Sequence, residues 1–324
     1  DRKMAKVVTR KCDVLVIGSE GAGARAAIEA SDAGVGVVMV TKGRLRRSGA
    51  TITGAADLDV DSRTLHSLLG MGDPDDSQDY FFRDMVVEGR YLNDQSLVQA
   101  HVEDVPDRVH ELLEWGLKVT EVRQMPGHSY PRNMYTSGLE MVKTLSRQVK
   151  KRPIKVLEDT LVTDLITQGG QVIGAVAVDL DRGEVIALAA KATVLATGGG
   201  HNLYPFTTGP EDLTGDGQAM AYRAGARLIN LEMMQFIPTT IIDPPLARGN
   251  LFPFLVGPQN ALRVWLLNKY GERFMGKWDP VRMEHSTRDL LSIGITSEIL
   301  EGRGSPRGGV YFSLAHLPRN LIAD

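Results

Sequence analysis

The sequence contains a single cysteine, Cys12, among 324 residues. One thiol cannot close an internal disulfide, and it cannot hold an iron–sulfur cluster, which needs several cysteine ligands. The sequence also lacks the apolar run of about 18 residues that a membrane-spanning helix requires. Its first residues have no apolar core of the kind found in secretory signals. These absences predict a protein without a membrane span and are consistent with a cytoplasmic location.

An excess of charge of either sign is also missing, because 37 Lys and Arg face 40 Asp and Glu. Neither nucleic acid nor an anionic membrane is therefore an expected partner. No group of residues has the spacing of a metal site, and no Ser-His-Asp order suggests a hydrolytic triad. The length suits two domains. We place the boundary where proline-rich loops begin, which gives domains at residues 1–235 and 236–324.

The first part of the chain reads as a strand, a helix and a second strand. Residues 12–17 are apolar β-formers, residues 18–34 are small and alanine-rich at helical spacing, and residues 35–41 form another apolar run. Gly34 suits the end of the helix. The resulting βαβ unit of about thirty residues predicts an α/β, Rossmann-like domain with a parallel sheet.

The remaining patterns extend this domain. We expect two helices within residues 77–116, broken near 91–93, and another helix from Met141 to Lys151. Three strands follow at 156–166, 171–180 and 185–197, with a turn at 181–184, and they form an antiparallel excursion from the sheet. A small-residue helix then covers 216–226. After residue 236 we expect an α+β capping domain.

The turn after the first strand departs from the usual nucleotide-binding fingerprint. That fingerprint is Gly-x-Gly-x-x-Gly, and here Gly18 and Gly23 keep the outer positions while Glu20 replaces the middle glycine. The first glycine permits a tight turn, the last lets the helix approach the strand, and the helix N-terminus attracts a pyrophosphate. A glycine-rich turn in an ordinary α/β domain is the alternative. The strand–helix–strand context favours a nucleotide pocket.

Several segments together resemble one family, the flavoprotein subunits of succinate dehydrogenases and fumarate reductases, with L-aspartate oxidase and adenylylsulfate reductase as relatives. The most specific are the Leu-Thr-Gly-Asp-Gly stretch from Leu213 and the Gly-Glu-Arg-Phe-Met stretch from Gly271. The resemblance covers essentially the whole chain. The segments that carry it are Val16–Ala30, Val40–Thr51, Tyr91–Val98, Thr193–Gly200, Leu213–Ala226, Leu267–Met275 and Ser286–Ser292.

The resemblance implies FAD as the cofactor. It places the first glycine-rich turn at the pyrophosphate, with the side chain of Glu20 turned away from it or bonded to a ribose hydroxyl. It places the segments after the second strand along the flavin and Val162 near the adenine. It also places the end of the strand at 185–197 and the start of the helix at 216–226 along the dinucleotide. The implied cofactor residues are Gly18, Ser19, Glu20, Gly21, Ala22, Gly23, Thr41, Lys42, Gly43, Ser48, Gly49, Ala50, Thr51, Gly54, Val162, Ala196, Thr197, Gly198 and Asp216.

Two departures from the family concern the flavin and the substrate. Many members attach FAD covalently through a histidine that follows Arg-Ser, and here Gly49 stands in that place, so we predict non-covalent FAD. On the substrate side, Gln235, Ile237 and Thr239 match a stretch in which the family has a histidine at the position of Ile237. Ile237 cannot donate a hydrogen bond to a carboxylate. A second set of substrate and proton-relay groups is replaced by apolar or neutral residues at 256–262.

The resemblance implies that Arg288 is the Brønsted acid that protonates the substrate carbon. A structural ion pair between Arg288 and Asp289 is the alternative. We predict an FAD-dependent oxidoreductase that exchanges hydride between flavin N5 and a small molecule other than a plain C4 dicarboxylate. There are two alternatives: a divergent succinate dehydrogenase or fumarate reductase, with His128 or Arg248 as substitute ligands, and a non-catalytic electron-transfer subunit that carries FAD.

Partners follow from the same resemblance. Since one cysteine cannot hold a cluster, we expect a separate iron–sulfur subunit to carry electrons. The family's chains run on past the position of Asp324, so we expect the capping domain to be incomplete and a second chain to be one way of completing the fold. We expect a cytoplasmic location, and attachment to the inner face of the membrane through partner subunits is the alternative.

Overall fold

The computed structural model describes residues 7–54, 57–249 and 264–322 and divides into two compact units built from interleaved segments. Unit 1 comprises the chain up to Leu58 together with residues 108–121 and 135–231. Unit 2 comprises residues 59–107, residues 122–134 and the chain from Glu232 onward. The predicted domain boundary between residues 235 and 236 stays a prediction.

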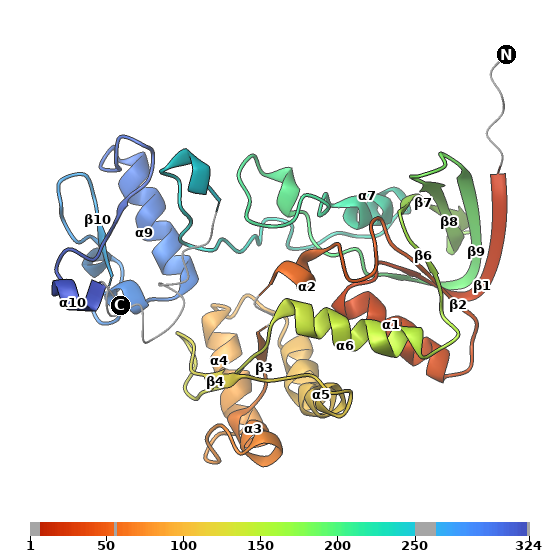
Figure 1. Ribbon diagram of the computed structural model, residues 1–324, viewed down its shortest axis with the longest axis horizontal. Helices are drawn as coiled ribbons and strands as arrows, with labels where there is room; N and C mark the ends of the chain where they lie inside the picture. The colour runs from red at the N-terminus through yellow and green to blue at the C-terminus, as the bar shows by residue number, and fades with distance from the viewer. Residues whose placement is uncertain (1–6, 55–56, 250–263, 323–324) are drawn as a thin grey trace. The chain divides into compact units, whose positions relative to one another are not determined.

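Unit 1 is built on a six-stranded sheet in the order β6-β2-β1-β9-β8-β7 (Figure 1). β1 pairs in parallel with β2 and β9, and β2 pairs in parallel with β6, whereas β8 runs antiparallel to β7 and β9. The predicted α/β fold with a parallel sheet and an antiparallel excursion is therefore confirmed. The strands are β1 (Val7–Ile17), β2 (Val37–Val40), β6 (Lys155–Leu157), β7 (Thr160–Gln168), β8 (Gln171–Asp179) and β9 (Val185–Leu195).

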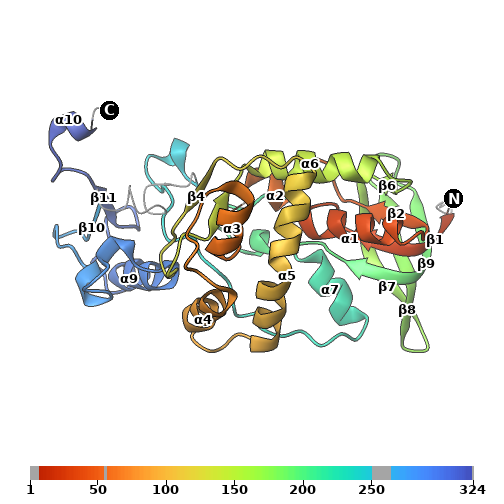
Figure 2. The same cartoon turned by 90° about the horizontal axis from the view of Figure 1, so that it is seen from below.

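Helices cover this sheet, and their small or apolar residues explain how closely they pack. Leu15 and Ile17 of β1 form a buried cluster with Met220 of α7 (Asp216–Arg223). Side chains alternate along a strand, so Val16 of β1, which is fully buried, points to the opposite face. α1 (Gly21–Asp32) packs against β1, β2 and β9, and α6 (Gly138–Lys150) lies beside it (Figure 2).

One sequence prediction for unit 1 is wrong in detail. The pattern at residues 156–166 predicts one strand, but these residues form the end of β6 and most of β7, which lie at opposite edges of the sheet. The chain turns between them at Asp159, whose φ of 47° is left-handed and cannot continue a strand. The carboxylate of Asp159 accepts a hydrogen bond from Arg44 Nε at 2.7 Å, which holds the turn.

Unit 2 contains the predicted pair of helices and the α+β elements near the end of the chain. α4 (Gln78–Glu88) and α5 (Gln95–Glu114) are separated at 89–94, as predicted, and the last turns of α5 belong to unit 1. β10 (Trp265–Leu267) pairs antiparallel with β11 (Tyr311–Ser313) beside α9 (Arg288–Leu300). The remaining elements, which come from both units, are α2 (Ala50–Thr53), β3 (Leu58–Asp59), α3 (Ser62–Leu69), β4 (Glu121–Arg123), β5 (Asn133–Tyr135), α10 (Arg319–Ile322) and short 3-10 helices at His201–Leu203, Pro245–Ala247, Met275–Lys277 and Met283–His285.

Unit 2 contains buried charged groups as well as a small apolar core. Arg132 is fully buried, and its guanidinium donates to both oxygens of Asp76 at 2.7 Å and to Asp84 at 2.5 Å. Near the end of the chain, Glu298 is also fully buried and accepts from Arg303. A buried charge is tolerated only when it is paired and hydrogen-bonded, so these networks fix how the surrounding helices and loops pack.

Candidate cofactor site

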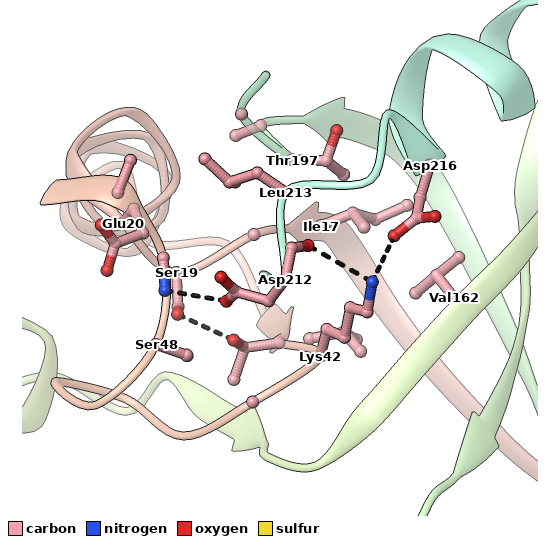
Figure 3. Close-up of a pocket in the computed structure, with 18 of the residues that line it drawn as sticks. Ile17, Ser19, Glu20, Lys42, Ser48, Val162, Thr197, Asp212, Leu213 and Asp216 are labelled. Atoms are coloured by element: carbon pink, nitrogen blue, oxygen red, sulfur yellow. Dashed lines mark hydrogen bonds and ion pairs between the residues drawn. The ribbon is translucent and has the colours of Figure 1, made fainter. Parts of the chain in front are cut away.

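Unit 1 contains a cavity of about 300 Å³ at the carboxyl ends of β1, β2 and β9 (Figure 3). In open α/β sheets this is the edge where ligands bind, because the loops after the strands and the N-termini of the following helices meet there. The lining also includes the first residues of α1, α2, β7 and α7. We call this space the unit-1 cavity.

Most of the residues predicted to contact the cofactor line the unit-1 cavity together. The exceptions are Gly23 and Gly54. Because the cavity walls come from segments up to about 200 positions apart in the sequence, their meeting is a result of the fold rather than of local spacing. Their contact with FAD stays a prediction. The predicted residues in the lining are Gly18, Ser19, Glu20, Gly21, Ala22, Thr41, Lys42, Gly43, Ser48, Gly49, Ala50, Thr51, Val162, Ala196, Thr197, Gly198 and Asp216.

Gly18 and Gly23 form the tight strand-to-helix turn at the base of the cavity. Gly18 has a φ of +113°, and a Cβ added to it would lie 2.0 Å from the backbone oxygen of Ala196. A Cβ on Gly23 would lie 2.1 Å from the backbone oxygen of Gly18. Both positions therefore require glycine, as the fingerprint predicts. Gly23 does not line the cavity itself. Because it has no side chain, α1 packs closely against the turn, and the N-terminus of α1 reaches the cavity.

Lys42 connects the end of β2 to the loop before α7. Its Nζ donates to the Thr214 hydroxyl at 2.8 Å, to Asp216 Oδ2 at 2.9 Å and to the backbone oxygen of Asp212 at 3.3 Å. Figure 3 shows Lys42 and Asp216 pointing toward each other. The Thr214 hydroxyl in turn donates to the Asp216 carboxylate at 2.9 Å. The conformation of residues 212–216 is thus tied to the segment predicted to follow the flavin.

Asp212 is the main cavity residue that the sequence did not reveal. Its Oδ2 accepts the backbone N–H of Gly49 at 2.8 Å, so a carboxylate from the loop before α7 holds the segment before α2. The available signal was the position of Asp212 directly before the Leu-Thr-Gly-Asp-Gly stretch. The other lining residues that were missed are mostly apolar: Ile17, Val40, Thr160, Leu161, Leu213 and Met220.

Glu20 directs its side chain to α2. Its Oε2 accepts the backbone N–H of Thr51 at 2.5 Å, and it makes no side-chain hydrogen bond to its own helix. Burial raises the pKa of Glu20 above its usual range, the nearby Asp212 charge adds to the increase, and the Thr51 hydrogen bonds oppose it. Glu20, the residue that departs from the fingerprint, therefore connects two walls of the cavity.

The residues predicted for substrate chemistry lie in unit 2. Gln235 and Ile237 are exposed, whereas Thr239 is buried and its hydroxyl oxygen has no hydrogen-bond partner among the described residues. Arg288 is exposed at the first residue of α9. Asp289 accepts from Arg90 Nη2 at 3.3 Å, so the ion pair observed at this carboxylate is with Arg90. Positions 256–262 lie outside the described residues.

Within the described part of the chain, no three His, Cys, Asp or Glu residues are grouped so that they could hold a metal ion. No helix in the same residues has both the length and the apolar character needed to cross a membrane.

Comparison with known proteins identifies the kind of cofactor. Residues 13–324 match a protein family described as FAD binding domain. The chain is 38% identical to one subunit of the fumarate reductase (CoM/CoB) of Methanothermobacter marburgensis, over 97% of this chain and 57% of that protein. It is 30% identical to a succinate dehydrogenase [ubiquinone] flavoprotein subunit of Xenopus laevis, over 98% of this chain and 48% of that protein.

A solved structure gives the same result for the fold. A variant of the E. coli quinol fumarate reductase superposes with a TM-score of 0.83 and 27% identity, over 98% of this chain and 56% of that one. The chain therefore spans about half the length of the relatives it matches.

The unit-1 cavity has the features that FAD requires. The glycine turn at Gly18 and the start of α1 present backbone N–H groups suited to a pyrophosphate. Val162, Leu213 and Met220 supply apolar walls for aromatic rings. Three carboxylates also line the cavity. Glu20 and Asp212 accept backbone N–H groups, and Asp216 pairs with Lys42, which offsets their repulsion of a phosphate. The residues present fit the cofactor.

Proposed function

This chain belongs to the family of FAD-binding flavoproteins that includes fumarate reductase and succinate dehydrogenase, and from that premise we propose that it acts on a substrate other than a plain C4 dicarboxylate. As a member of this family it is an FAD-dependent oxidoreductase. Bound FAD supplies hydride transfer at flavin N5, while the protein positions the substrate and moves its proton. The observation that carries the FAD assignment is the unit-1 cavity behind the Gly18 turn.

We assign the cofactor contacts by region of the cavity. The turn from Gly18 to Ala22 and the start of α1 would bind the pyrophosphate, with Gly23 supporting the turn. The segments from Thr41 to Gly43 and from Ser48 to Thr51 would follow the flavin, with Gly54 at the end of α2. Val162 would lie near the adenine, and Ala196, Thr197, Gly198 and Asp216 along the dinucleotide.

We propose that the FAD is held without a covalent bond. Gly49 stands where the sequence resemblance implies a linking histidine, and it has no side chain to form such a bond. Acid precipitation of the purified protein should release all of its flavin into the supernatant. Yellow colour or flavin fluorescence that stays with the precipitated protein would contradict this proposal.

The substrate proposal rests on Ile237. An exposed isoleucine in this position cannot pair with a carboxylate, and each lost hydrogen bond to a charged group typically costs about 1.5–3 kcal/mol. Gln235 and the buried Thr239 hydroxyl remain as polar groups for a less charged substrate. Arg288 is proposed as the proton donor. An arginine side chain holds its proton firmly, so it can act as an acid only at a desolvated site next to the substrate.

The first test is the visible spectrum of the anaerobically reduced protein before and after fumarate is added. We expect the flavin to stay reduced with fumarate and to be reoxidised by another small acceptor, in a reaction that Arg288→Gln slows at least about 100-fold, as loss of a general acid does. Arg282→Gln is the matched control, because Arg282 is an exposed arginine six residues earlier. The control variant should react like the wild-type protein.

Reoxidation by fumarate would instead support a divergent fumarate reductase, which the 38% identity to a fumarate reductase subunit favours as the second candidate. His128 and Arg248 would then be tested as substitute ligands. A reduced flavin that reacts only with a protein would indicate an electron-transfer subunit.

We also propose that a separate iron–sulfur subunit is the electron partner, because the single Cys12 cannot hold a cluster. Such a partner would determine whether the protein lies in the cytoplasm or on the inner face of the membrane. Co-purification of the tagged chain from its native host tests this. Iron and acid-labile sulfide in the purified complex are expected, and their absence would contradict the proposal.

A further inference from the structure

We propose that Glu20 is a positioning residue for FAD binding, which fixes the backbone from Gly49 to Thr51 along the unit-1 cavity and fills the space above Gly49. The inference rests on the proposed function, because it concerns how this chain prepares the same cavity for FAD. It assigns a role to the residue that breaks the fingerprint.

The contact joins two segments that are 31 positions apart in the sequence. Glu20 precedes α1, and its Oε2 accepts the N–H of Thr51 in the first turn of α2. The side chain passes directly over Gly49, because a Cβ built on Gly49 would lie 2.4 Å from both Cγ and Cδ of Glu20. Glu20 and a side chain at position 49 therefore cannot occupy this space together.

The backbone of Gly49 adds a second restriction. Its φ of 90° lies in a region that residues with a Cβ rarely adopt. Asp212 accepts the N–H of Gly49 at 2.8 Å, while Glu20 accepts the N–H of Thr51. Two carboxylates from different segments thus hold a short stretch in a conformation that requires glycine at position 49.

This arrangement should lower the cost of binding FAD. A loop that already has its bound conformation loses less conformational entropy when the ligand arrives. A carboxylate beside a phosphate also has an unfavourable effect, since the two charges repel. The two effects predict opposite results. If repulsion dominates, removal of the Glu20 side chain tightens FAD binding, and if positioning dominates, removal weakens it.

The experiment measures the FAD dissociation constant of the purified chain by quenching of flavin fluorescence, in a double-mutant cycle of Glu20→Gly and Gly49→Ala. We expect Glu20→Gly to weaken FAD binding about tenfold or more, the effect of losing one hydrogen bond to a charged group. We expect Gly49→Ala to weaken binding in the wild-type background and to cost clearly less when Glu20 is absent.

Two matched controls separate this contact from general effects. Gly34→Ala replaces a glycine with a φ of 80° and open space around the added Cβ, so it reports backbone strain without a clash. Asp13→Asn removes a carboxylate that accepts the Gly36 N–H at 2.7 Å outside the cavity lining. Both controls should leave the FAD dissociation constant within about twofold of wild type, which is the scatter expected for distant sites.

Amide hydrogen exchange in the FAD-free protein gives a readout that does not depend on the cofactor. The Thr51 N–H should exchange faster in Glu20→Gly than in wild type. Glu20→Gln, which keeps the length and one acceptor oxygen, should restore most of the protection. If Glu20→Gly does not fold, Glu20→Ala, which also removes the acceptor, replaces it in the same comparison. Unchanged or tighter FAD binding in Glu20→Gly, or an equal Gly49→Ala penalty in both backgrounds, would overturn the inference. A wild-type chain that binds no FAD would instead overturn the proposed function.

Discussion

The Nζ of Lys42 lies 2.9 Å from Oδ2 of Asp216, and this ion pair connects the end of β2 to the first residue of α7 in unit 1 (Figure 3). Both side chains are about one-third exposed, with fractional exposures of 35% and 36%. Lys42 also donates to Thr214 and to the backbone of Asp212, the residue that binds Gly49 through its carboxylate. A single ammonium group therefore stabilises the loop that forms one wall of the unit-1 cavity.

Replacement of this lysine should weaken cofactor binding more than it weakens the fold. We expect Lys42→Met to raise the FAD dissociation constant about tenfold, because it removes charge-assisted hydrogen bonds that hold residues 212–216. Lys191→Met is the control, since Lys191 pairs with Asp13 at 2.6 Å away from the cavity lining. Titration of both variants with FAD checks the prediction. Equal effects of the two substitutions would show that Lys42 has no special relation to the cavity.

The buried Arg132 is expected to be essential for the stability of unit 2. Arg132→Met removes the partner of Asp76 and Asp84 and leaves two buried carboxylates without a counter-ion. Breaking a buried ion pair on one side typically destabilises a protein by about 3–5 kcal/mol. Urea denaturation should show a much lower midpoint for this variant. Arg63→Met, which removes an exposed donor to the Pro74 oxygen, should change the free energy of unfolding by less than about 0.5 kcal/mol.

Acid should destabilise unit 2 through Glu298. Hydrogen bonds from Arg303 lower the pKa of Glu298 from 4.5 to about 2, against the effect of burial, and Asn268 and Lys277 also contribute. The folded state therefore binds this proton less readily than the unfolded state. The stabilisation is complete above about pH 4.5 and is lost progressively as the pH falls toward 2.

The test compares wild type with Glu298→Gln in urea denaturation at about pH 7 and about pH 3, on either side of the unfolded-state pKa. The stability difference between the two proteins should be large at the higher pH. It should shrink at the lower pH, because protonation of Glu298 in the unfolded chain then removes part of the stabilisation. Glu301, an exposed neighbour that also pairs with Arg303, offers the control Glu301→Gln. A difference that is the same at both pH values would contradict the assignment.

The turn at Gly18 should tolerate no side chain. In Gly18→Ala the new Cβ would meet the Ala196 oxygen at 2.0 Å, and the φ of +113° would strain the backbone. We expect loss of FAD binding and destabilisation by about 3 kcal/mol. Thermal denaturation and FAD titration beside Gly34→Ala measure this, since Gly34 also has positive φ but an open surrounding. A Gly18→Ala protein that behaves like Gly34→Ala would show that close packing at this turn is dispensable.

The sequence predicted well wherever local periodicity and turn residues decide the structure. The strand before Gly18, the helix that ends near Gly34 and the break between α4 and α5 follow from patterns within a few turns of chain. The same patterns predicted β6 and β7 as one strand, which is wrong. Both pieces have strand-forming residues, and only the packing around the left-handed Asp159 separates them.

The candidate site shows the same limit at the level of single residues. The family resemblance implied most of the cavity lining, whereas a backbone requirement by itself identified only Gly18 and Gly23. Asp212 carries no such local signature. Its carboxylate accepts a hydrogen bond from the backbone N–H of Gly49, 163 positions away in the sequence. This partner can be identified only from the folded structure, in which the two loops meet.

The sequence by itself determined the α/β class, the glycine turn and the FAD-binding family, because these depend on short-range geometry and on motifs with a fixed order. The tertiary structure alone decided that Glu20 reaches α2, that Lys42 binds the 212–216 loop and that Arg132 joins Asp76 to Asp84. The physical reason is that a charged side chain has many possible partners along a chain. Only the folded arrangement determines which of them lies within hydrogen-bonding distance and away from water.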